Sequence, residues 1–168
     1  MAKTAILFAG QGAQVVGMGQ DFVEAFPVAR DLFARADEAL GYELSQVCFN
    51  GPEEALTKTE NAQPGIFLVS WAALEVLKAQ VPSFKFEAAA GLSLGEFTAL
   101  TAAGVMAFQD GLRVVRQRGR FMQEACEATE GGMAAVIGLD EDTTREVCAA
   151  AEVELANLNC PGQLVISG

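Results

Sequence analysis

The feature that most constrains the fold of this chain is the pentapeptide Gly-Leu-Ser-Leu-Gly at residues 91–95. An apolar segment at 84–90 precedes it and predicts a strand, and residues 96–106 after it predict a helix. The two glycines permit a sharp turn between these elements at little steric cost. Such a turn presents its serine at the end of the sheet, against the N-terminus of the next helix. The pattern therefore predicts a nucleophile elbow, and with it an α/β fold.

The chemistry that this elbow favours is acyl transfer. The tetrahedral intermediate of that reaction carries a negative charge, which backbone N–H groups at a helix N-terminus stabilise. Ser93 is then the candidate nucleophile, and the amide of Leu94, the next residue, is the natural donor. A second donor can come from the turn around Gln11, after the predicted strand 4–9. Two plainer readings remain open: a Gly-Ser turn that caps the following helix, and a Gly-Gln-Gly turn without function.

The rest of the chain alternates between patterns typical of helices and strands, which is the α/β class. Gly131-Gly132 interrupts this pattern and predicts a boundary between parts 1–130 and 131–168. Only two clear strands precede this boundary, a poor scaffold for several apolar helices, so we expect an incomplete chain. The remaining expected helices are 27–40, with Gly41 just beyond the end, 53–58, 64–79, 110–128 and 141–151, and the remaining strands are 133–137, 153–157 and 164–167.

One arginine of the helix 110–128 stands out by its position. At about 100° per residue, Arg118 falls in the middle of the apolar stripe. A guanidinium keeps its proton, so burial requires a partner. A structural salt bridge to an acid such as Glu96 and a bidentate clamp for a substrate carboxylate are equally compatible with the pattern. The other arginines of this helix share an ordinary solvated face: Arg113, Arg116 and Arg120.

Composition excludes several classes of function. A formal net charge of −11 repels phosphate backbones and argues against nucleic-acid binding. The four cysteines form no close pair, so we expect no zinc site and reduced thiols. No apolar run reaches the ~18–20 residues that span a bilayer, and the start lacks the pattern of a signal peptide. We therefore expect a cytoplasmic protein without membrane segments. The sequence contains no histidine, the commonest general base.

Several stretches of the chain carry a resemblance to a known family. They occur in the family's order, and together they are far more specific than the pentapeptide alone. They read Phe-Ala-Gly-Gln-Gly-Ala-Gln at 8–14, Gly-Met-Gly at 17–19, Gln-Pro at 63–64, Gly-Leu-Ser-Leu-Gly-Glu-Phe at 91–97, Arg-Gln-Arg-Gly-Arg-Phe-Met at 116–122 and Asn-Leu-Asn-Cys-Pro-Gly-Gln at 157–163. The chain thereby resembles malonyl-CoA:acyl carrier protein transacylases and the acyltransferase domains of polyketide and animal fatty acid synthases.

The resemblance implies a fold of two parts. An α/β-hydrolase-like large subdomain holds the nucleophile, and a ferredoxin-like small subdomain is inserted into it. Residues 1–130 correspond to the first part of the large subdomain, and residues 131–168 to the first part of the small one. We expect the remainder of both to follow Gly168, so that the fold is truncated here.

The resemblance also implies roles for single residues. Ser93 takes the malonyl group from coenzyme A as an ester and passes it to the phosphopantetheine thiol of acyl carrier protein, in fatty acid synthesis. Gln11 and Leu94 supply the backbone donors of the oxyanion hole, and Arg118 grips the malonyl carboxylate. Malonyl-CoA and acyl carrier protein are the implied partners, the coenzyme A thioester is a substrate, and no metal or cofactor is expected. Asn157 and Asn159 match a strand that lines the cleft, and neither is assigned a role.

Two departures from the family pattern qualify these roles. Leu92 stands where the family commonly has a histidine, which is not the general base. The family's catalytic histidine is expected beyond Gly168, so this chain alone should be nearly inactive. Two alternatives stay open: a serine hydrolase, and a non-catalytic fragment that binds carrier protein.

Overall fold

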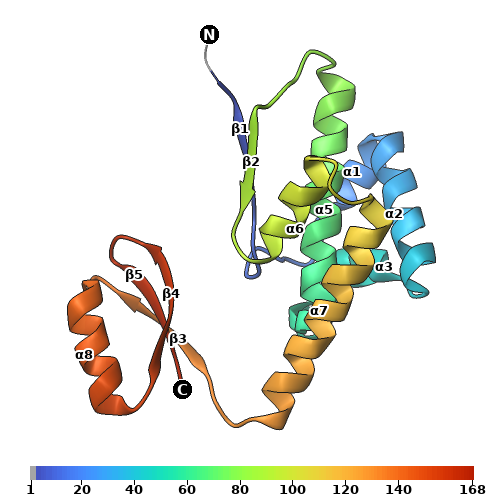
Figure 1. The fold of residues 1–168 in the computed structure, drawn as a ribbon. Helices are drawn as coiled ribbons and strands as arrows, with labels where there is room; N and C mark the ends of the chain where they lie inside the picture. The colour runs from blue at the N-terminus through green and yellow to red at the C-terminus, as the bar shows by residue number, and fades with distance from the viewer. Residues whose placement is uncertain (1–2) are drawn as a thin grey trace. The chain divides into compact units, whose positions relative to one another are not determined.

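The computed structural model describes residues 3–168, which divide into two compact units, one up to Glu124 and one over Ala125–Gly168. The sequence pattern placed the boundary at Gly131-Gly132, a few residues after this division. Figure 1 shows the elements of both units. In order, those of the first unit are β1 (Ala5–Phe8), α1 (Gln20–Ala25), α2 (Pro27–Leu40), α3 (Leu44–Asn50), α4 (Glu53–Thr57), α5 (Thr59–Gln80), β2 (Ala88–Gly91), α6 (Leu94–Ala102) and α7 (Phe108–Ala128).

The sheet of the first unit consists of β1 and β2, which lie side by side and parallel (Figure 1). Their register pairs Ala5 with Ala88 and Phe8 with Gly91. Because the strands are parallel and in register, their carboxyl ends meet at the same edge of the sheet. The loop after β1 and the turn after β2 therefore lie together, and both predicted strands are confirmed, although β2 begins four residues later than expected.

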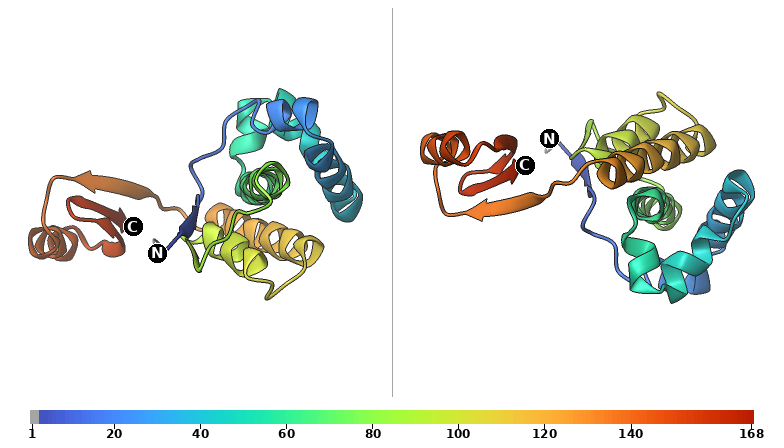
Figure 2. Two further views of the ribbon diagram at one scale, coloured as in Figure 1. Left: turned by 90° about the horizontal axis from the view of Figure 1, so that it is seen from above. Right: turned by 90° about the horizontal axis from the view of Figure 1, so that it is seen from below.

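Helix α5 is the centre of the first unit. Figure 2 shows it between α2 on one side and α6 with α7 on the other. Its side chains Phe67, Leu68 and Leu74 are almost completely buried, and the ring of Phe67 stacks on Phe108 of α7 with centroids 5.9 Å apart. Apolar residues on nearly every side predict such burial, and this prediction is confirmed.

Helix α2 forms where its sequence signals place it. Pro27 occupies the first helical position, where its missing N–H costs no hydrogen bond. Gly41 ends the helix with a φ of 71°, a conformation that glycine adopts without strain. Leu32 and Phe33 bury the apolar face against the core, so the predicted helix 27–40 is confirmed.

Other boundaries differ from the predicted ones. Helix α5 begins at Thr59, so Pro64 lies inside the helix and not at its first position. Helix α7 begins at Phe108, two residues before the predicted start of the helix 110–128, so Asp110, which the sequence pattern places at the N-cap, lies in the first turn. The short helices α1 and α3, of six and seven residues, were not predicted, since one or two turns give too few positions to establish a period.

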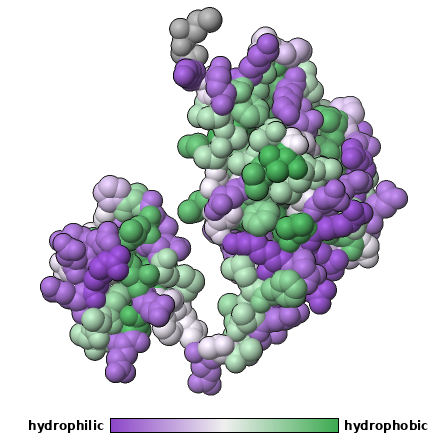
Figure 3. Space-filling view, viewed as in Figure 1, coloured by the Kyte–Doolittle hydropathy of each residue, from purple (hydrophilic) through white to green (hydrophobic). Residues whose placement is uncertain are grey.

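The edge of this sheet is less buried than the sequence suggests. The apolar run 4–9 predicts a buried strand, but of β1 only Phe8 is buried, and Leu7 is 78% exposed. Other large apolar side chains of this unit are exposed too, including Leu92 and Val105. In Figure 3, hydrophobic residues gather on the face that carries β2 and α6. The prediction of a buried first strand is therefore wrong for Ala5, Ile6 and Leu7, and correct for Phe8.

The second unit contains β3 (Met133–Ile137), α8 (Glu141–Ala151), β4 (Glu154–Cys160) and β5 (Gln163–Ser167). The strands form an antiparallel sheet in the order β3-β5-β4, and all four elements match predicted segments to within three residues. Helix α8 contacts β4 and β5 and buries Thr144 and Cys148.

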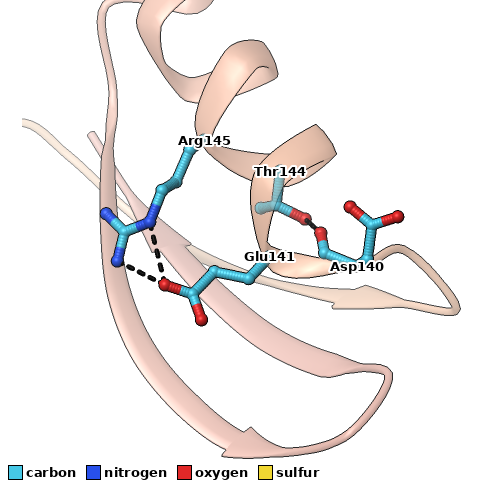
Figure 4. A network of polar contacts seen from close by, with 4 residues as sticks. All are labelled: Asp140, Glu141, Thr144 and Arg145. Carbon is cyan, nitrogen blue, oxygen red and sulfur yellow. Dashed lines mark hydrogen bonds and ion pairs between the residues drawn. The ribbon is translucent and has the colours of Figure 1, made fainter.

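Side chains at the start of α8 form hydrogen bonds and an ion pair that stabilise its first turn. An Oδ1 of Asp140 accepts a hydrogen bond from the backbone N–H of Thr143 at 2.8 Å, which lowers the pKa of Asp140 below its ordinary value of 3.8. The hydroxyl of Thr144 donates to the carbonyl of Asp140 at 2.7 Å, and Arg145 pairs with Glu141 at 2.6 Å (Figure 4). Asp140 is therefore a functioning N-cap.

All four cysteines are free thiols, as expected. Cys48 and Cys148 are buried, while Cys126 and Cys160 are exposed. Burial, helped by the nearby carboxylate of Asp37, raises the pKa of the Cys48 thiol to about 12. None of the helices within residues 3–168 has the length and apolar character that crossing a membrane requires.

Candidate functional site

The turn between β2 and α6 holds Ser93 in an unusual backbone conformation. Ser93 has φ 54° and ψ −101°, and non-glycine residues with positive φ are uncommon and strained. The amide of Gly95 donates to the carbonyl of Leu92 at 2.9 Å, and that of Glu96 donates to Ser93 at 3.2 Å. Ser93 itself is exposed. The sequence thus predicted the strand, turn and helix correctly, and the strain supports the interpretation as an elbow.

The glycines around Ser93 are required by close packing. A Cβ on Gly91 would lie 2.0 Å from the carbonyl carbon of Gly95. A Cβ on Gly95 would lie 2.4 Å from the carbonyl oxygen of Phe8, at the end of β1. A Cβ on Gly10 would lie 2.8 Å from the carbonyl oxygen of Leu92. The loop after β1 therefore touches the turn that carries Ser93.

Arg118 extends from α7 to Ser93. Its Nη2 donates to the Oγ of Ser93 at 2.8 Å, and its Nη1 donates to the Oε1 of Gln63 at 2.7 Å. The ring of Phe97, on α6, lies 5.6 Å from the guanidinium carbon. Within residues 3–168 no ion pair joins Arg118 to a carboxylate, so the predicted alternative of a salt bridge to Glu96 is wrong. Arg118 is half-buried, and its hydrogen-bond partners Gln63 and Ser93 are neutral, so neither compensates the charge of the guanidinium.

The other arginines of α7 are not all alike. Arg113 and Arg120 are exposed and pair with acids of the same helix, Asp110 at 3.3 Å and Glu124 at 3.6 Å, as expected for a solvated face. Arg116 differs from the prediction. It donates to the carbonyl of Leu40 at 2.9 Å and lies over the ring of Tyr42 at 4.6 Å. It therefore joins α7 to the end of α2.

Gln63 connects Arg118 to the loop after β1. Its side chain is completely buried in the second turn of α5. Its Nε2 donates to the Oε1 of Gln11 at 3.3 Å, and the Nε2 of Gln11 donates to the hydroxyl of Thr59 at 3.3 Å. Gln63 entered the sequence analysis only as part of the resemblance. The signal that could have found it is an amide side chain directly before the apolar run of a helix.

Leu94 is the first residue of α6, and its side chain is fully buried. Its N–H belongs to the first helical turn, whose amides have no acceptor within the helix. This position suits a donor to a negative charge that forms at Ser93. Asn157 and Asn159 lie on β4 in the second unit, where Asn159 donates to Gln163 at 3.5 Å.

The chemistry that these groups can perform is anion binding next to a hydroxyl. Arginine only donates hydrogen bonds, so the Oγ of Ser93 accepts from Arg118 and keeps its own proton for another acceptor. Arg118 cannot remove that proton. Among residues 3–168, no group of three or more histidine, cysteine, aspartate or glutamate side chains could hold a metal ion. The site therefore places a serine hydroxyl beside a cation.

Comparison with known proteins identifies relatives along the whole chain. The acyl transferase domain model matches residues 6–168. A malonyl CoA-acyl carrier protein transacylase of Bacillus subtilis is 48% identical over 175 residues, which cover 100% of this chain and 54% of the relative. One of Haemophilus influenzae is 43% identical, with 100% of this chain and 55% of the relative covered. The chain thus spans about half the length of the curated relatives that it matches.

Solved structures agree with these sequence matches. The crystal structure of a malonyl CoA-acyl carrier protein transacylase from Clostridium perfringens has a TM-score of 0.91 and 44% identity, covering 99% of this chain and 54% of that one. A malonyl-transacylase in complex with a type II PKS acyl-carrier protein has a TM-score of 0.93 and 40% identity, covering 99% and 55%. The α/β class is confirmed, and the fold is that of these acyltransferases. The chain belongs to the acyl transferase domain family.

Proposed function

We propose that the protein containing this chain transfers a malonyl group from coenzyme A to the thiol of acyl carrier protein, in fatty acid synthesis. The single observation that carries the proposal is the guanidinium of Arg118 at 2.8 Å from the Oγ of Ser93, on a strained elbow. A serine that attacks neutral esters gains no binding energy from a fixed cation beside it. A nucleophile for a substrate with a carboxylate gains an anchor. The names of the relatives supply the acyl group and the acceptor.

The proposed reaction has two steps. The Oγ of Ser93 attacks the thioester carbonyl, the carbon–sulfur bond breaks, and coenzyme A leaves as a thiol with the proton of the serine. In the second step the phosphopantetheine thiol attacks the serine ester, the bond between the acyl carbon and the Oγ breaks, and the proton of the thiol returns to Ser93. The charge on each tetrahedral oxygen is stabilised by the backbone amides of Leu94 and Gln11. Neither step uses a metal or a cofactor.

Arg118 would select the acyl group. In a malonyl ester of Ser93, the free carboxylate is only one methylene beyond the ester carbonyl. A guanidinium that already contacts the Oγ is within reach of that carboxylate and can bind it through its remaining N–H groups. An acetyl group has no such carboxylate, so the anchor favours malonyl over acetyl.

The finer architecture is also proposed. We assign the first unit to an α/β-hydrolase-like subdomain and the second to the start of an inserted ferredoxin-like one. The β3-α8-β4-β5 order with sheet order β3-β5-β4 supports the second assignment. We also propose that the proton acceptor is a histidine which these 168 residues do not contain. Loss of such a base costs on the order of 10⁴–10⁶ in rate, so the chain alone should be nearly inactive.

The test uses a chimera in which these 168 residues replace the matching part of the Bacillus subtilis relative, which is 48% identical. The chimera should transfer malonyl groups from malonyl-CoA to acyl carrier protein, and Ser93→Ala should reduce the rate by ~10⁴-fold or more. Equal transfer by the Ser93→Ala variant would refute the proposal. The unmodified relative and the melting temperature of each variant serve as controls.

The same experiment separates the alternatives. A serine hydrolase would release free malonate at the same rate with and without carrier protein. If the chain is a non-catalytic fragment, the chimera should bind carrier protein, and the native chimera and its Ser93→Ala variant should be equally inactive. The proposal requires that release of coenzyme A beyond the first turnover depends on the acceptor thiol.

A further inference from the structure

We propose that Gln63 is a positioning residue that sets the preference for malonyl groups by holding the guanidinium of Arg118 beside Ser93. The inference rests on the proposed function, and it adds a residue to which that function assigns no role. Gln63 does not touch Ser93. It acts through Arg118 on one side and through Gln11 on the other.

The orientation of the Gln63 amide follows from its partners. Its side chain is completely buried, where an unpaired amide is costly. Arginine only donates, so the atom of Gln63 that lies 2.7 Å from the Nη1 of Arg118 must be the oxygen. The nitrogen then faces Gln11, whose Oε1 accepts at 3.3 Å, and the sulfur of Met122 at 3.0 Å. Both the oxygen and the nitrogen of the amide therefore have hydrogen-bond partners, and a flip of the amide would lose the hydrogen bond from Arg118.

A fixed acceptor removes most of the freedom of Arg118. A long arginine side chain has many rotamers, and ordering it costs conformational entropy. Gln63 binds one edge of the guanidinium, and the ring of Phe97 lies 5.6 Å from its carbon. The remaining Nη2 is thereby aimed at Ser93. The anchor is ordered before the substrate binds, which reduces the entropy that binding costs.

The neutral charge of Gln63 matters as much as its position. A glutamate at residue 63 could accept the same hydrogen bond, but its carboxylate would compensate the charge of Arg118. The malonyl carboxylate would then meet a neutral pair instead of a free cation. An amide accepts from the guanidinium and leaves its charge available for the substrate.

The second partner of Gln63 extends this effect to the loop after β1. Gln11 is held between Gln63 and the hydroxyl of Thr59, the first residue of α5. The backbone amide of Gln11 is the second proposed oxyanion donor. One buried side chain therefore positions the anchor for the carboxylate and the loop that carries this donor.

The close approach of α7 to α5 makes the contact possible. Gly119 follows Arg118 in α7, and a Cβ at this position would lie 2.6 Å from the carbonyl oxygen of Thr59. Without a side chain at residue 119, α7 packs directly against the first turn of α5. Arg118 then reaches Gln63 in the next turn.

The first test measures positioning without catalysis, on the native 168-residue chain by NMR. The guanidinium N–H signals of Arg118, assigned by their loss in Arg118→Lys, should be protected from exchange with water. Gln63→Met removes the acceptor at similar size and should reduce this protection at least tenfold. Gln117→Met, at an exposed position of α7 next to Arg118, should leave the protection unchanged. Equal protection in native chain and Gln63→Met would overturn the proposal, whatever the fate of the proposed function.

The second test measures acyl preference in the chimera. Gln63→Met loses a hydrogen bond to a charged group, and Gln63→Glu compensates the charge of Arg118. In each variant, kcat/KM with malonyl-CoA should fall by about 10- to 100-fold. The loss should be mainly in KM, and kcat/KM with acetyl-CoA should change much less. An equal loss with both substrates would indicate a merely structural role and overturn the proposal.

Gln63→Glu keeps the size and the acceptor, so the test remains decisive if Gln63→Met does not fold. No transfer by the native chimera would instead refute the proposed function.

Discussion

Gly91 determines whether Ser93 can occupy its strained turn. Its missing side chain leaves the space in which the backbone of Gly95 lies, 2.0 Å from the position of a Cβ. We predict that Gly91→Ala lowers the free energy of unfolding by about 3 kcal/mol or more, because backbone must move to relieve the overlap. Urea denaturation of the 168-residue chain measures this loss. Gly132→Ala is the matched control, since a Cβ at Gly132 meets nothing within 4 Å. Equal stability of the two variants would contradict the close packing of the elbow.

Single residues differ in how far the sequence reveals them. Ser93 could be predicted, because the glycines, the strand and the helix that define its turn are adjacent in the chain. The unusual position of Arg118 could be predicted from helical periodicity, but its partner could not. Gln63 lies 55 residues from Arg118, and a hydrogen bond between helices leaves no periodic signal. The structure confirms the turn that holds Ser93, but the roles of Ser93, Gln11, Leu94 and Arg118 remain predictions.

Helix α7 depends on Gly119 for its place beside α5. Alanine favours helices over glycine by about 1 kcal/mol, so propensity alone predicts that Gly119→Ala stabilises the protein. The contact at 2.6 Å with the carbonyl of Thr59 predicts the opposite, and overpacking of about 1–3 kcal/mol should outweigh propensity. We therefore expect a lower melting temperature for Gly119→Ala, while Gln117→Ala, exposed on the same helix, should change it little. A gain in stability for Gly119→Ala would show that the helices are not in close contact.

Helix α8 should depend on pH through its N-cap. The pKa of Asp140 is lowered by its hydrogen bonds from Thr143, so the cap stabilises α8 when the carboxylate is charged. That contribution is complete well above pH 3.8 and is lost as the pH falls through the lower pKa of the folded state. Amide hydrogen exchange of α8 should show weaker protection in Asp140→Ala than in the native chain at neutral pH. This difference should shrink below pH 3.8.

The control for this prediction is Asp140→Asn, which keeps a cap without a charge. Its protection at neutral pH should lie close to that of the native chain, and it should lack the acid-dependent loss. A constant difference between native chain and Asp140→Ala at every pH would contradict the role of the ionised carboxylate.

Whole elements were predictable where start and stop signals agreed with periodicity. Helix α2 has Pro27 at its start and Gly41 after its end, and it was located correctly. Helix α8 was located correctly from its pattern, and the structure adds Asp140 as its N-cap. The predicted start of α5 came too late in the chain because Pro64 was interpreted as its first residue. Tertiary packing extends this helix by one further turn to Thr59, at the expense of the hydrogen bond that a proline cannot donate.

The whole chain leaves apolar surface uncovered in its first unit. Leu7, Leu92 and Val105 are each more than 60% exposed, and Leu7 lies on a strand at the edge of the sheet. Exposed apolar edge strands promote association between chains. We predict that the isolated 168-residue chain self-associates with rising concentration in sedimentation velocity experiments, and that Leu7→Lys reduces this association. Gln20→Lys changes the net charge equally at an already exposed polar position and is the control. A single monomeric species of the native chain would contradict the prediction.

At the scale of the molecule, the alternation of helices and strands was enough to predict the α/β class. The family followed from six stretches considered jointly, since each motif alone is compatible with plain turns. The distribution of exposed apolar residues could not be predicted, because periodicity shows which face of an element is apolar and not what covers it. Leu7 illustrates this limit: its apolar strand predicted burial, and the structure leaves it exposed.

The most direct test of the account is the position of the acyl group after the first step. The chimera is exposed to malonyl-CoA without acceptor, quenched in acid, digested, and its peptides are analysed by mass spectrometry. We expect a malonyl ester on Ser93, and no such ester in the Ser93→Ala variant. A malonyl group on another residue, or equal labelling of the Ser93→Ala variant, would contradict the assignment of Ser93 as the nucleophile.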